Sequence, residues 1–353
     1  MRLQAAVLMS ILLVSISTKA GEVRWYKGNT HAHTTLCGHA DSTPEAVTAW
    51  YHEHGYNFLC LSEHNQFIDP ATVPMPKDKR ADFILVPGQE VTGKTHMTAL
   101  NVMRLVKFDF KSAKVSEVIQ NHVDGTLEAK GTPILNHPNF MWAVKPSDIM
   151  EVKRLHMFEL FNGHPTVNNL GDDARPSTEK VWDYVLSNGL VMYGVGSDDV
   201  HTLKKWGPKI SNAGRGWVMV RSAELAPDAI AKAMANGDFY ASSGLMLKDV
   251  SVSKTSYSVE IDEQATAKEL DSPVLYPNRV ATGEPGYRIE WIGAEGKVLS
   301  SVKDTKATFK IDPANPYVRC KVTVCRKDGD SFIEASAWTQ PAFTDGRVEK
   351  LQR

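Results

Sequence analysis

Residues 28–39 read GNTHAHTTLCGH and contain three histidines, His31, His33 and His39. One residue separates His31 from His33, and alternate side chains of an extended strand point to the same face. Both imidazoles can therefore reach one metal ion. The strand then runs into a turn that carries His39, which could serve a neighbouring ion. A single H-x-H pair also occurs on ordinary protein surfaces, so the interpretation depends on ligands elsewhere in the chain.

Several apolar segments of strand length end in residue types that bind metals. The segment 56–62 runs into Glu63 and His64, and a helix predicted at 44–54 precedes it. This β-α-β pattern repeats as far as a last helix at 228–236, and five of the seven predicted strands end in His, Asp or Glu. Because such folds place their chemistry at the C-terminal ends of parallel strands, we expect a distorted (β/α)7 barrel with a metal site there. The later strand ends are Gly88-Gln89-Glu90, Asn136-His137, Asn162-Gly163-His164 and residues 196–201.

The sequence pattern changes at Leu247. Segments such as 257–261, 287–291 and 318–324 alternate apolar and polar residues, and Gly- and Asp-containing turns separate them. Such alternation is typical of antiparallel strands with one buried face. We therefore expect a barrel domain at 21–246 and a small antiparallel β-sandwich-like domain at 247–353. Nothing in the second domain indicates chemistry, and we interpret it as a module that packs against the barrel or flanks the substrate.

The N-terminus has the features of a signal peptide at residues 1–20. Arg2 precedes an apolar run from Ala5 to Ile16, and small residues at Thr18 and Ala20 fit a cleavage site after Ala20. The run is short for a transmembrane span, and an uncleaved anchor is the alternative. We therefore predict an exported protein, periplasmic or secreted, with no stable membrane anchor after cleavage.

Composition narrows the function classes. The chain is 42% apolar and 23% charged, which is ordinary for a globular protein, and its formal net charge of −1 gives no electrostatic case for nucleic acid or an anionic membrane. The cysteines show no disulfide framework, because Cys320 and Cys325 lie at an odd offset in a predicted strand and point to opposite faces. None of the 12 histidines follows His201, so we expect any metal chemistry in the first two thirds of the chain.

The side chains at the predicted strand ends form a candidate ligand set. Imidazoles with a few carboxylates suit Zn²⁺, Mn²⁺ or Fe²⁺ better than Ca²⁺ or Mg²⁺. The set is too large for one tetrahedral site, so we expect two or three divalent ions with a bridging carboxylate. Its members are His31, His33, His39, His64, Glu90, His96, His137, Asp199 and His201.

These residues stand in ordered motifs that resemble those of the polymerase-and-histidinol-phosphatase (PHP) family over about residues 25–245. Two further stretches, 236–244 and 337–341, resemble the exported, carbaryl-hydrolase-like branch. The resemblance implies a metal-dependent phosphoesterase. The motifs are HAHT at 31–34, CGHA at 37–40, SEHN at 62–65, PGQE at 87–90, NHP at 136–138 and DVH at 199–201.

The resemblance also implies how the ligands divide among three ions, of which several branches of the family lack the third. The family motif is Asp-x-His, so Asp199 would be the ligand, and the adjacent Asp198 would support the centre or fill the turn. The implied groups are His31, His33, Glu90 and Asp199 for the first ion, Glu90 with His96 and His137 for the second, and His39, His64 and His201 for the third.

Further residues are candidates for other roles. His164 follows a predicted strand and could contact substrate or protonate a leaving group; with Asp198 it is a catalytic candidate, and a solvated loop histidine is the alternative. Glu63 could orient a ligand or be a surface carboxylate. Arg215 and Lys94 could neutralise a phosphate, but solvated loop residues are the favoured interpretation. The histidines predicted to be structural are His52, His54, His122 and His156.

We therefore expect an enzyme, an exported metal-dependent phosphoesterase that attacks phosphorus with a metal-bridging hydroxide. Its substrate would be a small-molecule phosphate ester rather than nucleic acid. Export disfavours histidinol phosphatase itself, whose pathway is cytosolic. A carbamate or carboxylic ester hydrolase with the same metal centre is the first alternative, and a non-catalytic exported metal-binding protein is the second.

Overall fold

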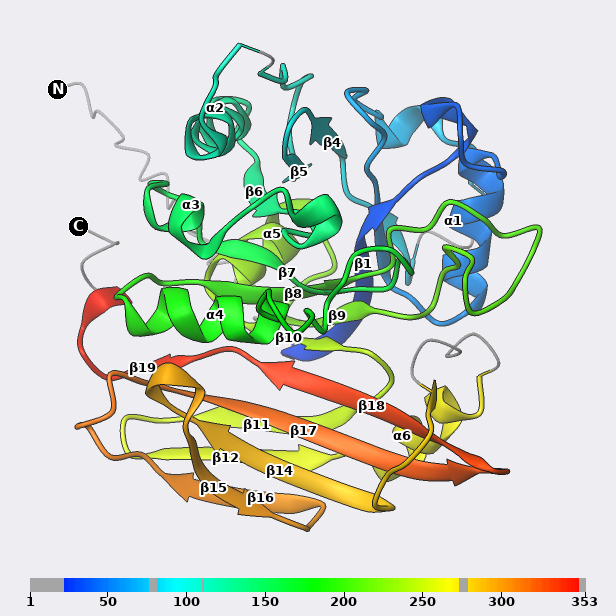
Figure 1. The fold of residues 1–353 in the computed structure, drawn as a ribbon. Coiled ribbons are helices and arrows are strands. Elements are labelled where there is room, and N and C mark those ends of the chain that lie inside the picture. Colours follow the sequence, from blue (N-terminus) through cyan, green and yellow to red (C-terminus); the bar gives the residue numbers. More distant parts are fainter. Residues whose placement is uncertain (1–21, 76–80, 110, 273–278, 349–353) are drawn as a thin grey trace, which may run out of the picture.

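The computed structural model describes residues 22–75, 81–109, 111–272 and 279–348. The predicted signal peptide at 1–20 lies outside these ranges and stays a prediction. Within them, no helix is both long and apolar enough to cross a membrane. The described chain is a mixed α/β protein whose strands form three sheets. The strands that follow β10 (Phe239–Ser242) lie in the lower half of Figure 1, below most of the helices.

The first sheet contains β1 (Arg24–Ala32), the strand that carries His31. The last seven residues of β1 are buried. β1 pairs in parallel with β2 (Phe58–Leu61), and the helix α1 (Pro44–Glu53) connects the two strands. The close pairing requires Gly28, since a Cβ there would lie 2.1 Å from the ring of Phe58. The sheet continues with β3 (Ile84–Leu85) beside β2, with β9 (Trp217–Ser222) beside β1 and with β10 beside β9.

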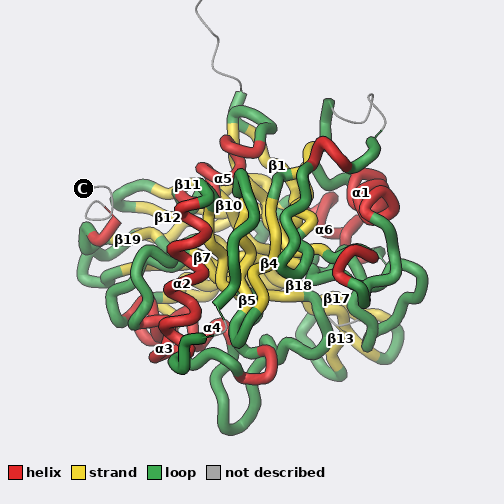
Figure 2. Tube along the Cα trace, turned by 90° about the horizontal axis from the view of Figure 1, so that it is seen from above, coloured by secondary structure: helices red, strands yellow, loops and turns green. Residues whose placement is uncertain are grey.

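The second sheet has five strands in sequence order, and the remaining helices of this part of the chain lie beside the strands (Figure 2). Among its first three strands, each is antiparallel to the next, and its last three strands are parallel. The strands are β4 (Gly88–Thr92), β5 (His96–Leu100), β6 (Thr132–Leu135), β7 (Met157–Asn162) and β8 (Tyr193–Ser197). The helices are α2 (Val115–Glu128), α3 (Pro146–Met150), α4 (Thr178–Ser187) and α5 (Pro227–Ala235).

The described strands do not show the predicted (β/α)7 repeat. Three residues, 93–95, join β4 to β5, and so short a turn makes the two strands antiparallel. β9 and β10 are also antiparallel, although α5 lies between them in the sequence. The first two sheets meet at isolated bridges, Ala32 with Val200 and His64 with Glu90. These bridges bring the end of β1 close to the residues that follow β8, and the residues that follow β2 close to β4.

The alternating segments after Leu247 form antiparallel strands, as predicted. β10 pairs with β18, so the first sheet continues across the predicted domain boundary at residue 246, and that boundary stays a prediction. The third sheet consists of β11 (Leu247–Val252), β12 (Ser256–Ile261) and β16 (Lys306–Lys310). The strands that extend the first sheet are β13 (Arg279–Val280), β14 (Gly286–Ile292), β15 (Val298–Val302), β17 (Tyr317–Asp328), β18 (Ser331–Thr339) and β19 (Ala342–Phe343), and the helix here is α6 (Glu263–Leu270).

Buried polar contacts join the C-terminal strands to the rest of the chain. Arg319 of β17 is 1% exposed, and its Nε and one terminal nitrogen each donate to Asp183 of α4 at 2.8 Å. The side chain of Gln340 bonds both the N–H and the C=O of Gly194 in β8. Because a buried charge is costly without its partner, the Arg319–Asp183 pair fixes how β17 sits against α4.

Candidate metal centre

His31 and His33 lie on the same face at the end of β1, as their spacing predicts. Both side chains are buried, and their Nε2 atoms are 3.0 Å apart. The surroundings drive their pKa values in opposite directions. Burial works against the charged form of His31, but the carboxylates of Asp199, Glu159 and Glu90 hold its pKa well above 6.5. Burial lowers the pKa of His33 to about 3, so this ring is neutral.

The carboxylate of Glu90 in β4 is the meeting point of the predicted ligands. Burial opposes its charge, but the neighbouring imidazoles, His31 and His96 foremost, hold its pKa well below the usual value. Asn136 also donates its side-chain amide to Oε1, at 2.8 Å. The imidazole nitrogens around Glu90 are His64 Nδ1 at 2.6 Å, His31 Nε2 and His96 Nδ1 at 3.2 Å, and His137 Nε2 at 3.3 Å.

Asp199 faces Glu90 across the same space. Its Oδ1 lies 3.3 Å from Nε2 of both His31 and His33, and its Oδ2 lies 3.9 Å from His137 Nε2. Asp199 and His137 have positive φ angles of 52° and 21°, a conformation that non-glycine residues rarely adopt. Such strain persists only where the surrounding structure enforces it, and it clusters at functional sites. The backbone here is therefore shaped to aim these two side chains inward.

A second group of imidazoles lies on the outer side of the centre. Ligand atoms of His39, His64 and His201 lie within 4.8 Å of one another, and the ring of His39 stacks on His64 and His201 at 5.0 and 4.7 Å between centroids. A 3-10 turn at Thr35–Cys37 follows β1, and Gly38 with φ of 83° ends it. This left-handed glycine turns the chain so that His39, although exposed, reaches the group.

The donor set fits divalent transition-metal ions. Nitrogen and oxygen ligand atoms face one another at 2.6–3.9 Å around Glu90 and Asp199, at the inner end of a cavity of 390 Å³. Imidazoles with a few carboxylates are the ligands of Zn²⁺, Mn²⁺ and Fe²⁺. The structure thus brings together all nine side chains of the predicted set, and their binding of metal stays a prediction. The cavity lining comprises His39, His64, Glu90, His96, His137, Phe140, His164, Asp199, His201, Thr202 and Ser211.

Glu159 of β7 supports the centre from behind, and the sequence analysis missed it. Its Oε1 accepts from His31 Nδ1 at 2.8 Å and from the Ser197 hydroxyl at 2.5 Å. Its Oε2 accepts from the His137 N–H and the Asn162 amide, both at 2.8 Å. A bond from Nδ1–H directs the Nε2 lone pair of His31 towards the ligand cluster. The available signal was one charge inside the apolar segment 155–161, which is costly to bury without partners.

The structure does not bring Asp198 to the cavity, so its catalytic role has no geometric support. Burial raises the pKa of this carboxyl, against the hydrogen bonds that favour its charge. Both oxygens are occupied by donors from β1, α1 and the residues just before β9. The donors are Asn29 Nδ2, the Tyr51 hydroxyl and the backbone N–H groups of Gly214, Arg215 and Gly216, at 2.7–2.8 Å. Asp198 therefore fixes the turn that positions Asp199.

The other candidate residues differ in their burial and in whether they line the cavity. His164 lines the cavity and packs edge-on against His201, as a substrate-contacting residue would. Glu63 is fully buried rather than on the surface, and burial raises its pKa to about 7. Arg215 is buried and bonds carbonyls of its own loop, at Gly207 and Ile210, so the prediction of a solvated side chain is wrong. Lys94 is exposed and bonds the carbonyls of residues 112 and 113.

The histidines predicted to be structural lie away from the cavity lining. His52 contacts Asp82 at 3.1 Å, and His54 stacks on Trp50 with centroids 3.8 Å apart. His122 accepts a hydrogen bond from the Asp109 N–H, and Nδ1 of His156 bonds the carbonyl of Val191.

No protein-family model matches the chain, and no curated protein matches it. Among solved structures, the chain is similar to a two-domain protein from Bacteroides vulgatus ATCC 8482 that contains a predicted PHP-like metal-dependent phosphoesterase. The two share 12% identity over 95% of this chain and 100% of the other, with a TM-score of 0.46.

Proposed function

We propose that this chain is an exported metal-dependent hydrolase of small-molecule phosphate esters, with two or three Zn²⁺, Mn²⁺ or Fe²⁺ ions. The observation that carries the proposal is the carboxylate of Glu90, approached within 3.3 Å by nitrogens of four histidines at the inner end of a cavity. A bridging carboxylate with imidazoles on both sides is the ligand pattern of a multinuclear hydrolytic centre.

Such ions supply Lewis acidity and a water nucleophile at neutral pH. The described lining of the cavity includes no Lys or Arg. The charge of a bound phosphate would therefore be balanced by the ions that the ligand cluster would hold, rather than by a guanidinium or ammonium group. Phe140, which packs against His137 at the cavity wall, gives the substrate's organic group an apolar surface.

In this proposal, His164 interacts with the leaving group. The Thr166 N–H points at its Nδ1, 3.4 Å away, and the Thr166 hydroxyl lies 3.0 Å from the same atom. A ring that accepts at Nδ1 carries its proton on Nε2. Burial lowers the pKa of His164, which keeps the ring neutral at physiological pH. His164 would thus donate a hydrogen bond from Nε2–H to a departing oxygen and stabilise the charge that develops there.

A carbamate or carboxylic ester hydrolase is the second candidate. The described lining of the cavity contains no Lys or Arg, and such a lining also suits a substrate without charge. The same residues would hold ions that could polarise a carbonyl oxygen, and Phe140 would contact the acyl or alcohol group. The rate ratio between naphthyl phosphate and naphthyl carbamate, measured on one preparation, distinguishes the two candidates.

The test begins with elemental analysis of the purified protein and hydrolysis assays before and after chelation. We expect two or three equivalents of metal, loss of activity on chelation and recovery with Zn²⁺ or Mn²⁺. Glu90→Gln should lose both metal and activity, whereas Glu334→Gln, an exposed position on β18, should lose neither. A metal-loaded protein inactive on aryl phosphates, phosphodiesters and aryl carbamates would instead support the non-catalytic metal-binding alternative.

A further inference from the structure

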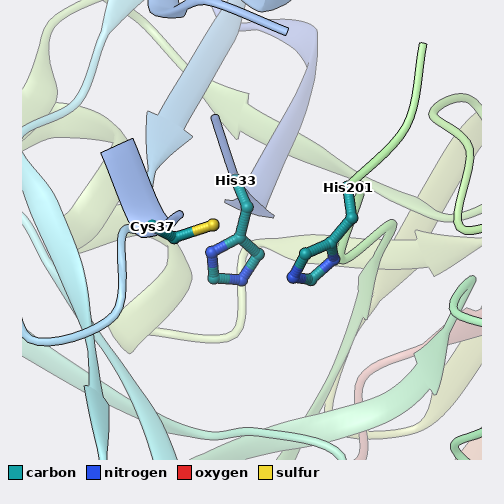
Figure 3. A group of neighbouring side chains, drawn as sticks. All are labelled: His33, Cys37 and His201. Atoms are coloured by element: carbon teal, nitrogen blue, oxygen red, sulfur yellow. The ribbon is translucent and has the colours of Figure 1, made fainter. Parts of the chain in front are cut away.

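Cys37 lies beside the candidate centre, and none of the ligand groups considered so far includes it. It is the last residue of the 3-10 turn after β1, and it is partly exposed, whereas Cys60, Cys320 and Cys325 are buried. Figure 3 shows its sulfur directed at the ring of His33, with His201 on the far side of that ring. Ligand atoms of Cys37, His33 and His201 all lie within 4.8 Å of one another.

Two buried polar atoms next to this cysteine have no hydrogen-bond partner. They are His33 Nδ1 and Glu63 Oε2, which lie 3.9 Å apart on side chains that are 1% and 0% exposed. Leaving such a group unsatisfied costs about 1–3 kcal/mol, so each one requires an explanation. Glu63 already uses its other oxygen, Oε1, to accept from the N–H and hydroxyl of Thr34. One unpaired nitrogen and one unpaired oxygen thus adjoin a thiol.

A cation bound by the Cys37 thiolate and His33 would also place a positive charge beside the unpaired oxygen of Glu63. A tetrahedral Zn²⁺ takes sulfur at about 2.3 Å and nitrogen or oxygen at about 2.0–2.2 Å. Its ligand atoms then lie about 3.3–3.7 Å apart, closer than the 4.8 Å within which the three ligand atoms lie here, so the side chains would draw together on binding. A hydrogen bond between Glu63 and His33 alone would satisfy both orphaned atoms without making Cys37 a ligand, and the experiments below distinguish the two.

We propose that Cys37 is a metal ligand, whose thiolate binds an ion together with His33 and His201 on the outer side of the candidate centre. This inference rests on the proposed metal centre and adds a sulfur ligand to it. On binding, the S–H bond breaks, the proton leaves to solvent and a sulfur–metal bond forms. Thiolate is a soft ligand, so this position selects Zn²⁺ or Co²⁺ over Mn²⁺ or Mg²⁺.

Cobalt substitution tests the inference without an activity measurement. Sulfur ligation gives Co²⁺ an intense near-ultraviolet charge-transfer band, which nitrogen and oxygen ligands do not. We expect this band in the wild type and in Cys325→Ser, the matched control in the C-terminal strands, and its loss in Cys37→Ser. A band that survives in Cys37→Ser, or a wild type that shows visible Co²⁺ bands but no charge-transfer band, would overturn the inference and leave the metal centre intact. No visible Co²⁺ bands at all would overturn the proposed centre itself, and this inference with it.

Alkylation of the unmodified protein gives a second measurement that needs no variant. Cys37 is the accessible thiol of the four, so iodoacetamide should label it in chelator-treated protein, as peptide mass analysis would show. Zn²⁺ should slow that labelling by about tenfold or more, because a metal-bound thiolate is a poor nucleophile. Equal labelling rates with Zn²⁺ and with chelator, in protein that elemental analysis shows to hold its metal, would contradict the proposal.

Discussion

Glu159→Gln is the most informative single change to the centre. The variant keeps the size of the side chain but replaces one acceptor oxygen with an NH₂ group. The backbone N–H of His137 cannot reverse its polarity, so the remaining oxygen should stay where Oε2 now accepts from it. The new NH₂ then faces Ser197, whose hydroxyl can rotate, and His31 Nδ1. His31 must present a lone pair at Nδ1 and move its proton to Nε2, the atom that faces Glu90 and Asp199.

The expected effect on metal binding follows from this tautomer change. A proton on His31 Nε2 blocks the lone pair that the first ion requires. Loss of a partner that orients a ligating histidine weakens metal affinity about 10–100-fold, which corresponds to about 1.4–2.8 kcal/mol. The other ligands of that group, His33, Glu90 and Asp199, keep their contacts, so the affinity should fall without abolishing binding.

The assay is competition for Zn²⁺ against a chromophoric chelator, on protein whose fold has been checked by circular dichroism. Glu334→Gln is the matched control, since it makes the same chemical change at an exposed site on β18. We expect wild-type affinity in the control and a 10–100-fold loss in Glu159→Gln. Affinity in Glu159→Gln within twofold of the wild type would refute the idea that Glu159 fixes the His31 tautomer.

Three further predictions concern other parts of the molecule. His39→Ala should remove one equivalent of bound metal by elemental analysis, because the outer group loses one of its imidazoles; an unchanged stoichiometry would exclude His39 as a ligand. Burial lowers the pKa of His122 from 6.5 to about 4, so the unfolded chain binds this proton more readily, and about 3 kcal/mol of stability is lost as the pH falls through that window. Urea titrations of metal-free protein should show that the free energy of unfolding falls by about 3 kcal/mol less in His122→Gln than in the wild type between pH 6.5 and 4. An equal fall in both proteins would contradict a lowered pKa of His122. Arg319→Met leaves Asp183 buried and unpaired, so the free energy of unfolding should fall by about 3–5 kcal/mol in urea titrations; a change below 1 kcal/mol would show that Asp183 finds water instead.

The features that the sequence predicted are set by local spacing. Alternation on a strand is sufficient to place His31 and His33 on one face, and Thr43 before Pro44 is sufficient to begin α1. Alternation after Leu247 likewise predicts antiparallel strands with one buried face. Polar residues at strand ends also pointed to the ligand set, because strands packed side by side bring their ends together even when some of them are antiparallel.

The features that it did not predict depend on contacts between distant segments. The (β/α)7 interpretation assumed a parallel partner for each strand, but β4 and β5 form a hairpin whose residues lack an alternating pattern. Nothing local shows that Asp198 would be enclosed by donors while its neighbour Asp199 faces the cavity. Arg215 lies between glycines, which suggested solvent, yet the loop before it folds over the guanidinium. In each case the position of the residue is decided by a partner that is distant in the sequence or by the conformation of a loop, and not by residue type.

The buried charges of the centre raise the question of how the chain folds without an ion. The carboxylates of Asp199, Glu159 and Glu90 outweigh burial and raise the pKa of His31, whereas burial lowers the pKa of His33 beside it. When His31 takes up a second proton without an ion, Nδ1–H stays bonded to Glu159 and the added proton lies at Nε2, 3.0–3.3 Å from acceptors on His33, Glu90 and Asp199. That proton would then occupy the position that the first ion takes in the proposed centre. Metal binding must displace this proton, so the carboxylates that stabilise the empty cluster also make its affinity for metal fall as the solution becomes more acidic.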